Sequence, residues 1–272
     1  MNEIIIEPNK SLKRFWRELW AYRDLFYFLA WRDVLVRYKQ TTIGIAWSVV
    51  RPLLTAVVFT LVFSRIAKLP SGNVPYPILI YAAMLPWQFF SNSIQQSAES
   101  LIQDANLISK VYFPRLIIPS TAIAVSLIDF FISLVILFAL MIWYGYLPDG
   151  KIIFLPLLLL WLTMVSLGGG FLLAALNVKY RDFRYIVPFI VQFGLYICPV
   201  GFSSDLVPEK FRFIYSLNPM VGIIDGFRWV LLGKNVNLYW PGFLLSLLIT
   251  VILFISGVIY FLKTERKFAD VI

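Results

Sequence analysis

Histidine is absent from the 272-residue chain, and Cys198 is its only cysteine. These absences exclude imidazole-based proton transfer and metal binding, intramolecular disulfides and thiolate metal clusters. The phosphate-binding loop G-x-x-x-x-G-K-[ST] is absent as well. We therefore expect no metal site, no catalytic residue and no ATP hydrolysis by that machinery in this chain.

Charge is scarce, at 14% of residues, whereas hydrophobic residues reach 60%. In soluble proteins these fractions are about a quarter and about half. Uncharged runs of the roughly 20 residues needed for a membrane-spanning helix recur along the chain, and they are longer than barrel strands. The sequence predicts an all-α polytopic membrane protein. We attribute the net charge of +9 to cytoplasmic loops and not to nucleic-acid binding.

Six apolar segments are long enough to be transmembrane helices. They lie between a polar, aromatic N-terminal segment (1–40) and a short charged tail (263–272). We predict a single transmembrane domain over residues 1–272, with a six-span bundle over 41–262. The expected spans cover residues 41–64, a segment beginning at 78, then 116–147, 152–178, 186–202 and 241–262.

Lysine and arginine are distributed unequally between the two sets of loops. Sixteen of the twenty-four lie in segments 1–42, 99–115, 179–185 and 263–272, against seven in the alternate loops. Cytoplasmic loops of membrane proteins carry such an excess. Both termini are therefore predicted to be cytoplasmic, as an even number of spans requires.

Residues 11–40 mix aromatic and charged residues. Apolar side chains recur at helical spacing, with charges largely on the other side. This pattern predicts an amphipathic helix lying on the membrane surface and not through it. The apolar positions are Leu12, Phe15, Trp16, Leu19, Tyr22, Phe26 and Leu29.

Arg51 and Asp129 are the charges placed within predicted spans. A charge at membrane depth costs a few kcal/mol or more unless it is paired or hydrated, so each is a candidate functional residue. Arg51 either extends back to the cytoplasmic headgroups or attracts a phosphate group. Asp129 lies deeper and either pairs within the bundle or faces water.

Aromatic and amide side chains alternate in the second predicted span. Sugars offer apolar faces and hydroxyl edges, so such a mixture suits a glycan path. Hydrogen bonds between helices explain the amides equally well. The candidate lining residues are Trp87, Phe89, Phe90, Asn92 and Gln95, together with Asp129.

Two further segments are too short to cross a membrane. Residues 99–115 predict an amphipathic helix on the cytoplasmic side, which either docks on another protein or lies on the lipid surface. Residues 216–229 are interrupted by Asn218, Pro219, Gly222 and Gly226. They predict re-entrant helices between spans five and six that form an external gate, or alternatively a lipid-facing hairpin. The candidate gate residues are Asn218, Pro219, Met220, Asp225 and Arg228, of which the last two are spaced to pair.

Several motifs, taken in order, make the whole chain resemble the membrane subunit of ABC-2 type exporters of bacterial surface polysaccharides. This family includes exporters of O-antigen, teichoic acid and capsule. The motifs are WRDVLVRYKQTTIGIAW at 31–47, RPL at 51–53, ISKVYFPR at 108–115, LNVKYRD at 176–182, LNPM at 217–220 and FADVI at 268–272.

The resemblance implies a homodimeric channel in the bacterial inner membrane, driven by two copies of a separate ATPase that binds ATP and Mg. It implies that segment 99–115 is a coupling helix seated in that ATPase, through Glu99, Asp104, Asn106, Leu107, Lys110, Tyr112, Phe113 and Arg115. The substrate would be a polysaccharide on undecaprenyl diphosphate. From charge and depth we assign the diphosphate to a cytoplasmic entrance formed by Arg32, Arg37, Lys39 and Arg51.

Two other functions remain open at this point. An ABC-2 exporter of teichoic acid, capsule, a small lipid or a drug would share the architecture. A membrane-embedded glycan-modifying transferase would need an acid–base constellation in the membrane. The lack of histidine, with Asp129 as the one carboxylate at depth, disfavours the transferase.

Overall fold

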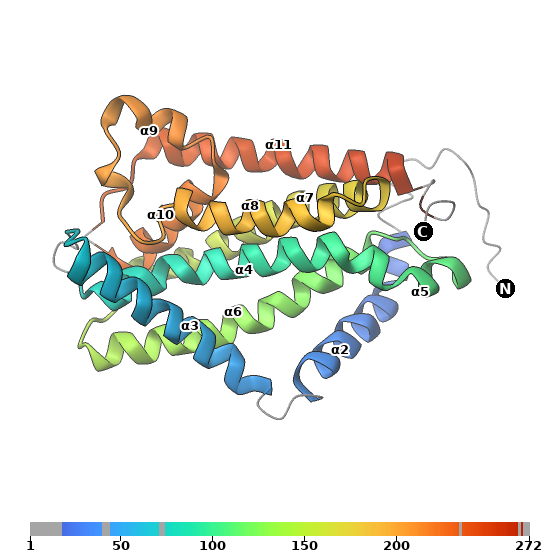
Figure 1. Cartoon of the computed structure of the whole chain (residues 1–272), viewed down its shortest axis with the longest axis horizontal. Helices are drawn as coiled ribbons and strands as arrows, with labels where there is room; N and C mark the ends of the chain where they lie inside the picture. The colour runs from blue at the N-terminus through green and yellow to red at the C-terminus, as the bar shows by residue number, and fades with distance from the viewer. Residues whose placement is uncertain (1–17, 40–43, 71–73, 234–235, 266–267, 269–272) are drawn as a thin grey trace.

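The computed structural model describes residues 18–39, 44–70, 74–233, 236–265 and 268, with the side chains of 44–48 and 51 outside that description. Within these ranges every regular element is a helix (Figure 1). The longer helices are α2 (Arg23–Lys39), α3 (Gly44–Thr60), α4 (Tyr76–Gln103), α6 (Ile117–Trp143), α7 (Leu155–Lys179), α8 (Phe183–Ile197), α10 (Pro219–Leu232) and α11 (Trp240–Glu265). The short ones are η1 (Leu61–Ile66), α5 (Ala105–Lys110), η2 (Gly150–Phe154), η3 (Ser204–Leu206) and α9 (Glu209–Tyr215).

Three helical segments are long and apolar enough to cross a membrane: Ile117–Trp143, Gly150–Lys179 and Trp240–Glu265. Two shorter apolar helical segments, Pro52–Ile66 and Phe183–Ile197, accompany them. The chain is an all-α membrane protein, as predicted. Each expected span coincides with a helix, whereas the count of six membrane crossings stays a prediction.

The fifth predicted span extends five residues beyond the end of its helix. α8 ends at Ile197, and Cys198 is extended with ψ 152°. The residue before a proline is driven out of the helical region, and Pro199 follows Cys198. At 1.5 Å per residue the 15-residue helix is roughly 22 Å long, which is shorter than a hydrocarbon core.

α4 is the central helix of the bundle and runs the length of the molecule (Figure 1). Pro75 and Pro77 set its first turn, where a missing backbone N–H costs no hydrogen bond. Nineteen of its residues are buried, against α6, α7, α10, α3 and α8. Because other helices surround it, α4 can carry hydroxyls and amides that a lipid-exposed helix could not.

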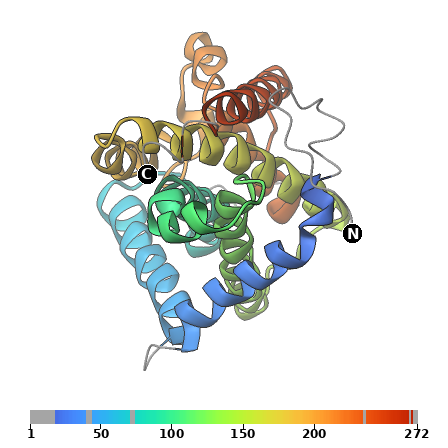
Figure 2. The ribbon, with the colours of Figure 1, turned by 90° about the vertical axis from the view of Figure 1, so that its right-hand side faces the viewer.

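One end of the bundle is closed by α2, α5 and the end of α11. Leu29, Ile108, Phe113 and Phe268 belong to one buried cluster there. Viewed from this end, α2 lies across the edge of the bundle (Figure 2). Four of the predicted apolar positions of segment 11–40 do pack inward: Phe26 and Leu29 of α2, and Leu19 and Tyr22 just before it. Leu12, Phe15 and Trp16 lie outside the described residues, and the placement of α2 on a membrane surface stays a prediction.

The opposite end is formed by α9 and α10 (Figure 1). α10 is inserted among α4, α7 and α11. Its glycines permit this approach, because a larger residue would clash with the neighbouring helices. A Cβ added at Gly222 would lie 2.6 Å from Ser246 Cβ, and a Cβ added at Gly226 would lie 2.9 Å from Leu158 Cδ2. These two glycines therefore let α10 pack closely against its neighbours.

Candidate functional site

A cavity of about 380 Å³ lies between the end of α2 and helices α3, α4, α6 and α8. We call it the central cavity. Five of the six predicted lining residues border it: Trp87, Phe89, Asn92, Gln95 and Asp129. The rest of the lining is Arg37, Tyr38, Pro52, Thr55, Met84, Leu85, Gln88, Ser91, Phe130, Ser133, Val191, Gln192 and Leu195.

The polar part of the lining comes largely from one stripe of α4. Gln88, Ser91, Asn92 and Gln95 are spaced by three or four residues or are adjacent, so the helix presents them on one side. The three amide residues are half-buried. This stripe gives the cavity several hydrogen-bond donors and acceptors and no fixed charge.

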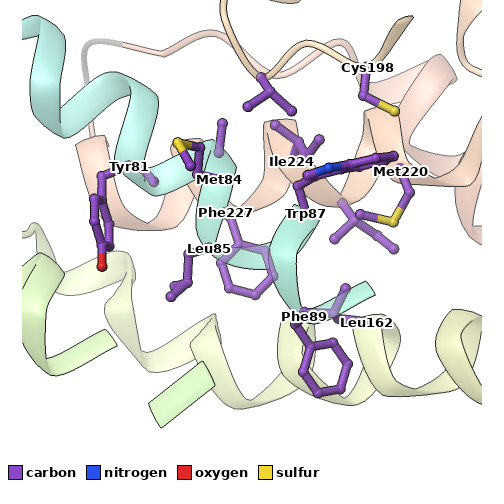
Figure 3. Close-up of a cluster of buried hydrophobic side chains, with 14 of the residues drawn as sticks. Tyr81, Met84, Leu85, Trp87, Phe89, Leu162, Cys198, Met220, Ile224 and Phe227 are labelled. Carbon is purple, nitrogen blue, oxygen red and sulfur yellow. The ribbon is translucent and has the colours of Figure 1, made fainter. Parts of the chain in front are cut away.

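The aromatic residues of α4 contribute less free surface than the sequence suggested. Trp87 and Phe89 are 5% and 2% exposed. Figure 3 shows both rings within the hydrophobic cluster, with Trp87 beside Met220 of α10. A Cβ at Gly194 would lie 2.5 Å from the Trp87 indole, so α8 holds this ring closely. Most of each ring therefore packs against protein and only a small part borders the cavity.

Phe90 does not line the central cavity. It packs against the hydrophobic cluster, with its ring centroid 5.9 Å from that of Trp87. The sequence could not separate Phe90 from Phe89, because both follow Trp87 in an apolar run and only the helix geometry decides which one turns toward the cavity.

Asp129 of α6 is paired at the edge of the central cavity. Its Oδ2 lies 2.7 Å from Arg37 Nη2, and the Tyr38 hydroxyl donates to its Oδ1. Arg37 Nη1 also donates to Gln96 Oε1 at 3.4 Å. The side chains of Arg37 and Asp129 are 32% and 15% exposed. Pairing within the bundle thus removes the cost of an isolated charge at this depth.

A second cavity, of about 340 Å³, lies between α2, α4 and α6; we call it the α2 cavity. Arg37 borders both cavities. In the α2 cavity, Arg32 Nη2 lies 2.7 Å from Asp33 and 3.0 Å from Asp104. The hydrogen bond with Asp104 raises the pKa of the Arg32 guanidinium, and burial raises the pKa of the Asp33 carboxyl.

The four predicted entrance residues are therefore not equivalent. Arg32 and Arg37 already pair with carboxylates. Lys39 is exposed in the last turn of α2. The side chain of Arg51 lies outside the described residues.

Segment 99–115 is a short α5 helix with its flanks. Asn106, Lys110 and Tyr112 are exposed, while Glu99, Asp104, Leu107 and Arg115 are half-buried. Phe113 is 3% exposed and belongs to the buried cluster that also contains Leu29 of α2. This ring therefore anchors the segment to its own bundle, and its contact with a partner ATPase stays a prediction. Arg115 fixes the segment to α11, its backbone N–H donating to Glu265 Oε1 at 2.9 Å.

The predicted gate residues lie at the other end. Asn218 caps α10 by accepting from the Met220 N–H at 3.0 Å, and Pro219 occupies its first turn. The expected Asp225–Arg228 ion pair does not form within 4.0 Å. Arg228, 1% exposed, instead donates to the carbonyls of Phe202, Val200 and Leu79 at 2.7, 3.0 and 3.4 Å.

Sequence reasoning missed several polar residues of the central cavity, among them Tyr38 and Gln192. Gln192 could have been predicted as a lining residue, since it is the one amide side chain of the α8 segment. Tyr38 could not, because tyrosine is common near membrane surfaces and does not by itself indicate a cavity. The described residues contain no group of three or more acidic or cysteine side chains placed to hold a metal ion.

Comparison with known proteins agrees with the resemblance drawn from the motifs. The chain is 27% identical to the O-antigen export system permease protein RfbA of Klebsiella pneumoniae, over 92% of this chain and 95% of that protein. It is 28% identical to the O-antigen export system permease protein RfbA of Myxococcus xanthus, over 93% and 97%. It is 26% identical to the capsule polysaccharide export inner-membrane protein CtrC of Neisseria meningitidis, over 78% and 80%. Residues 24–232 match the family model described as ABC-2 type transporter. The chain therefore belongs to the ABC-2 type transporter family.

Proposed function

We propose that this chain is the membrane permease subunit of a polysaccharide exporter, and that its substrate is a lipid-linked glycan. The names of its relatives supply the substrate class, since they are export permeases for O-antigen and for capsule polysaccharide. O-antigen carried on undecaprenyl diphosphate is the preferred substrate, because the relatives with this name match the larger share of the chain.

The observation that carries the proposal is the polar stripe of α4 in the central cavity. The volume of about 380 Å³ falls within the range of about 300–1,000 Å³ typical of ligand sites. Amide and hydroxyl groups exchange hydrogen bonds with sugar hydroxyls without a strong preference for one sugar. Because an export path must release its substrate, hydrogen bonds of this moderate strength suit it.

Energy for export is proposed to come from a separate ATPase, which binds ATP and Mg. Two permease copies and two ATPase copies would form the exporter in the inner membrane, with six spans per copy and both termini cytoplasmic. Asn106, Lys110 and Tyr112 offer an exposed contact surface on segment 99–115. The re-entrant α9–α10 region then lies at the external mouth as its gate.

α2 offers a mechanical connection between this contact surface and the central cavity. Arg32 ties α2 to Asp104, which lies between α4 and α5. Five residues further along the same helix, Arg37 ties α2 to Asp129 at the cavity. We propose that movement of segment 99–115 by the ATPase displaces α2 and changes access to the cavity. The cationic side chains of α2, with Arg51, would receive the diphosphate of the substrate.

The capsule exporter CtrC is also a relative, so capsule polysaccharide is the second candidate substrate. A small apolar lipid or drug would gain nothing from the amide stripe.

The test is a deletion strain that has no redundant exporter. We expect lipid-linked glycan to accumulate in the inner leaflet and surface glycan to disappear. Restoring the wild-type chain should reverse both effects, whereas a chain with Gln88, Asn92 and Gln95 replaced by leucine should restore neither. Normal surface glycan in the deletion strain would rule out the proposed function.

A further inference from the structure

A third cavity lies apart from the central cavity, at the junction of α4, α5 and the link between α7 and α8. Its volume is about 370 Å³. We call it the basic cavity, because Arg181 and Arg184 line it. The other lining residues are Glu99, Ile102, Gln103, Ala105, Asn177 and Val178. Asn177 and Arg181 come from the motif LNVKYRD, to which the proposed export path gives no role.

Both arginines are free of acidic partners. Arg181 and Arg184 are exposed, and neither lies within 4.0 Å of a carboxylate among the residues that the structure describes. The neighbouring Lys179 is directed elsewhere, with its Nζ 4.8 Å from the centre of the Tyr180 ring. The cavity therefore presents two guanidinium groups in a position to bind an anion, and guanidinium matches phosphate oxygens well.

Two other lining residues, Asn177 and Glu99, supply hydrogen-bond acceptors. Asn177 is 0% exposed, and its amide nitrogen donates to Ala98 O at 2.7 Å. Its Oδ1 is buried and has no hydrogen-bond partner within the described ranges. Burying a polar atom without a hydrogen-bond partner is unfavourable. Glu99 adds a half-buried carboxylate that accepts from Gln103 Nε2 at 3.2 Å. A donor group on a ligand would satisfy both acceptors.

We propose that the basic cavity binds the headgroup of a membrane phospholipid that carries both a phosphate and a primary ammonium, as phosphatidylethanolamine does. Arg181 and Arg184 bind the phosphate diester. The ammonium donates to Asn177 Oδ1 and Glu99. A free phosphate ion, or a carboxylate side chain of a protein, would use the arginines and leave the acceptors unsatisfied.

The surroundings fit a bound lipid. Tyr180 and Tyr185 flank the arginines and are 47% and 78% exposed, as tyrosines at a membrane interface are. α8 begins at Phe183 and exposes apolar side chains from its first turns onward, at Ile186, Phe189 and Ile190. Acyl chains extending from the headgroup would find this apolar surface next to the cavity.

The experiment measures lipid retention by the purified full chain in nanodiscs of equal phosphatidylethanolamine and phosphatidylcholine. Native mass spectrometry after release counts the lipids bound to each chain. We expect the wild-type chain to retain phosphatidylethanolamine at least threefold over phosphatidylcholine, whose trimethylammonium has no N–H to donate. The Arg181→Gln/Arg184→Gln variant should lose retention of both lipids.

Two matched variants complete the design. Arg23→Gln/Lys263→Gln removes the same charge outside the cavity and should retain lipid as the wild type does. Glu99→Gln should keep the phosphate contacts and lose the preference over phosphatidylcholine. Melting temperatures of all variants show whether each is folded, and the comparison of two lipids on the wild type needs no variant.

Three outcomes would overturn the proposal. Equal retention of the two lipids by the wild type would exclude recognition of the ammonium. Displacement of the lipid by inorganic phosphate alone would make the site one for free phosphate. Unchanged lipid retention by the arginine variant, combined with failure to co-purify with the ATPase, would assign the cavity to a protein contact. None of these results depends on whether the exported substrate is a glycan, so this proposal can fail separately from the proposed function.

Discussion

At the scale of single residues, two charged side chains within the bundle are held by specific partners. Asp129 is paired with Arg37 beside the central cavity, and Arg228 is hydrogen-bonded to three carbonyls at the α10 end. In both cases the cost of burying a charge is offset by specific partners. We therefore expect a loss of stability in each case when one partner is removed.

Replacing Asp129 with asparagine should destabilise the protein more than replacing both partners. The single change leaves the Arg37 guanidinium half-buried without its carboxylate. Loss of one member of a buried pair costs 3–5 kcal/mol; with a third of the Arg37 side chain exposed, we expect about 2 kcal/mol after allowing for solvent screening. The Arg37→Met/Asp129→Leu variant should recover at least half of it, because no charge stays unpaired.

A double-mutant cycle of Arg37→Met, Asp129→Leu and the double variant, followed by melting temperature in detergent, measures this coupling. Additive losses from the two single changes would show that the ion pair contributes no interaction energy.

Arg228→Lys should loosen the α10 end of the protein. A lysine ammonium cannot reach three carbonyls contributed by the segment after α8 and by α4, and hydrogen bonds of charged groups contribute about 1.5–3 kcal/mol each. We expect a loss of roughly 2 kcal/mol, measured as a lower melting temperature. Arg212→Lys is the control, since Arg212 donates to two carbonyls of a more exposed loop. An equal effect of both changes would contradict the special role given to Arg228.

At the scale of helices, α7 and α11 cross with their backbones in close contact. A Cβ at Gly257 would lie 2.2 Å from Gly168 O, and one at Gly168 would lie 2.6 Å from Phe254 Cα. Backbone atoms cannot move aside as side chains can. Such contacts between small residues let transmembrane helices associate closely.

Gly257→Val should therefore separate α7 from α11 and prevent stable folding. We expect aggregation on size-exclusion chromatography after extraction. Gly150→Ala is the control, because a Cβ there meets no atom within 4 Å. A monodisperse Gly257→Val variant with unchanged melting temperature would refute the tight crossing.

The proposed connection through α2, between segment 99–115 and the central cavity, can be tested by its effect on export. Arg32→Gln removes the ion pair with Asp104 and so weakens the connection of α2 to segment 99–115, leaving only the apolar contacts of their shared cluster. In the complex with the ATPase we expect ATP hydrolysis to continue within twofold of the wild type while glycan export falls at least tenfold. Arg32→Lys should restore part of the export. If hydrolysis and export fell together in Arg32→Gln, the role of α2 as a connection would be excluded.

At the scale of the whole molecule, the sequence predicted the helices and the general location of the cavity well. Long apolar runs identify spanning helices without knowledge of their neighbours. The amide pattern of α4 likewise placed Asn92 and Gln95 on the cavity. Local helical periodicity was sufficient in these cases.

Sequence reasoning failed where the answer depends on partners far apart in the chain. Arg32 and Asp104 are separated by 72 positions, so their pairing had no local signal. The amphipathic pattern of segment 99–115 did not reveal that Phe113 packs against its own bundle, because such a pattern does not show which face meets it. Asp225 and Arg228 had the spacing for a helical pair, but the carbonyls after α8 offered Arg228 better partners.

The central claim is that the glycan passes the polar stripe of α4 in the central cavity. A photo-crosslinking amino acid at position 92, in membrane vesicles that contain the ATPase and lipid-linked glycan, tests it most directly. Position 248 is the control, because Leu248 is 56% exposed on α11 and does not line the cavity. We predict an ATP-dependent glycan adduct at position 92 and none at position 248. An adduct at position 248 with none at position 92 would contradict this account of the export path.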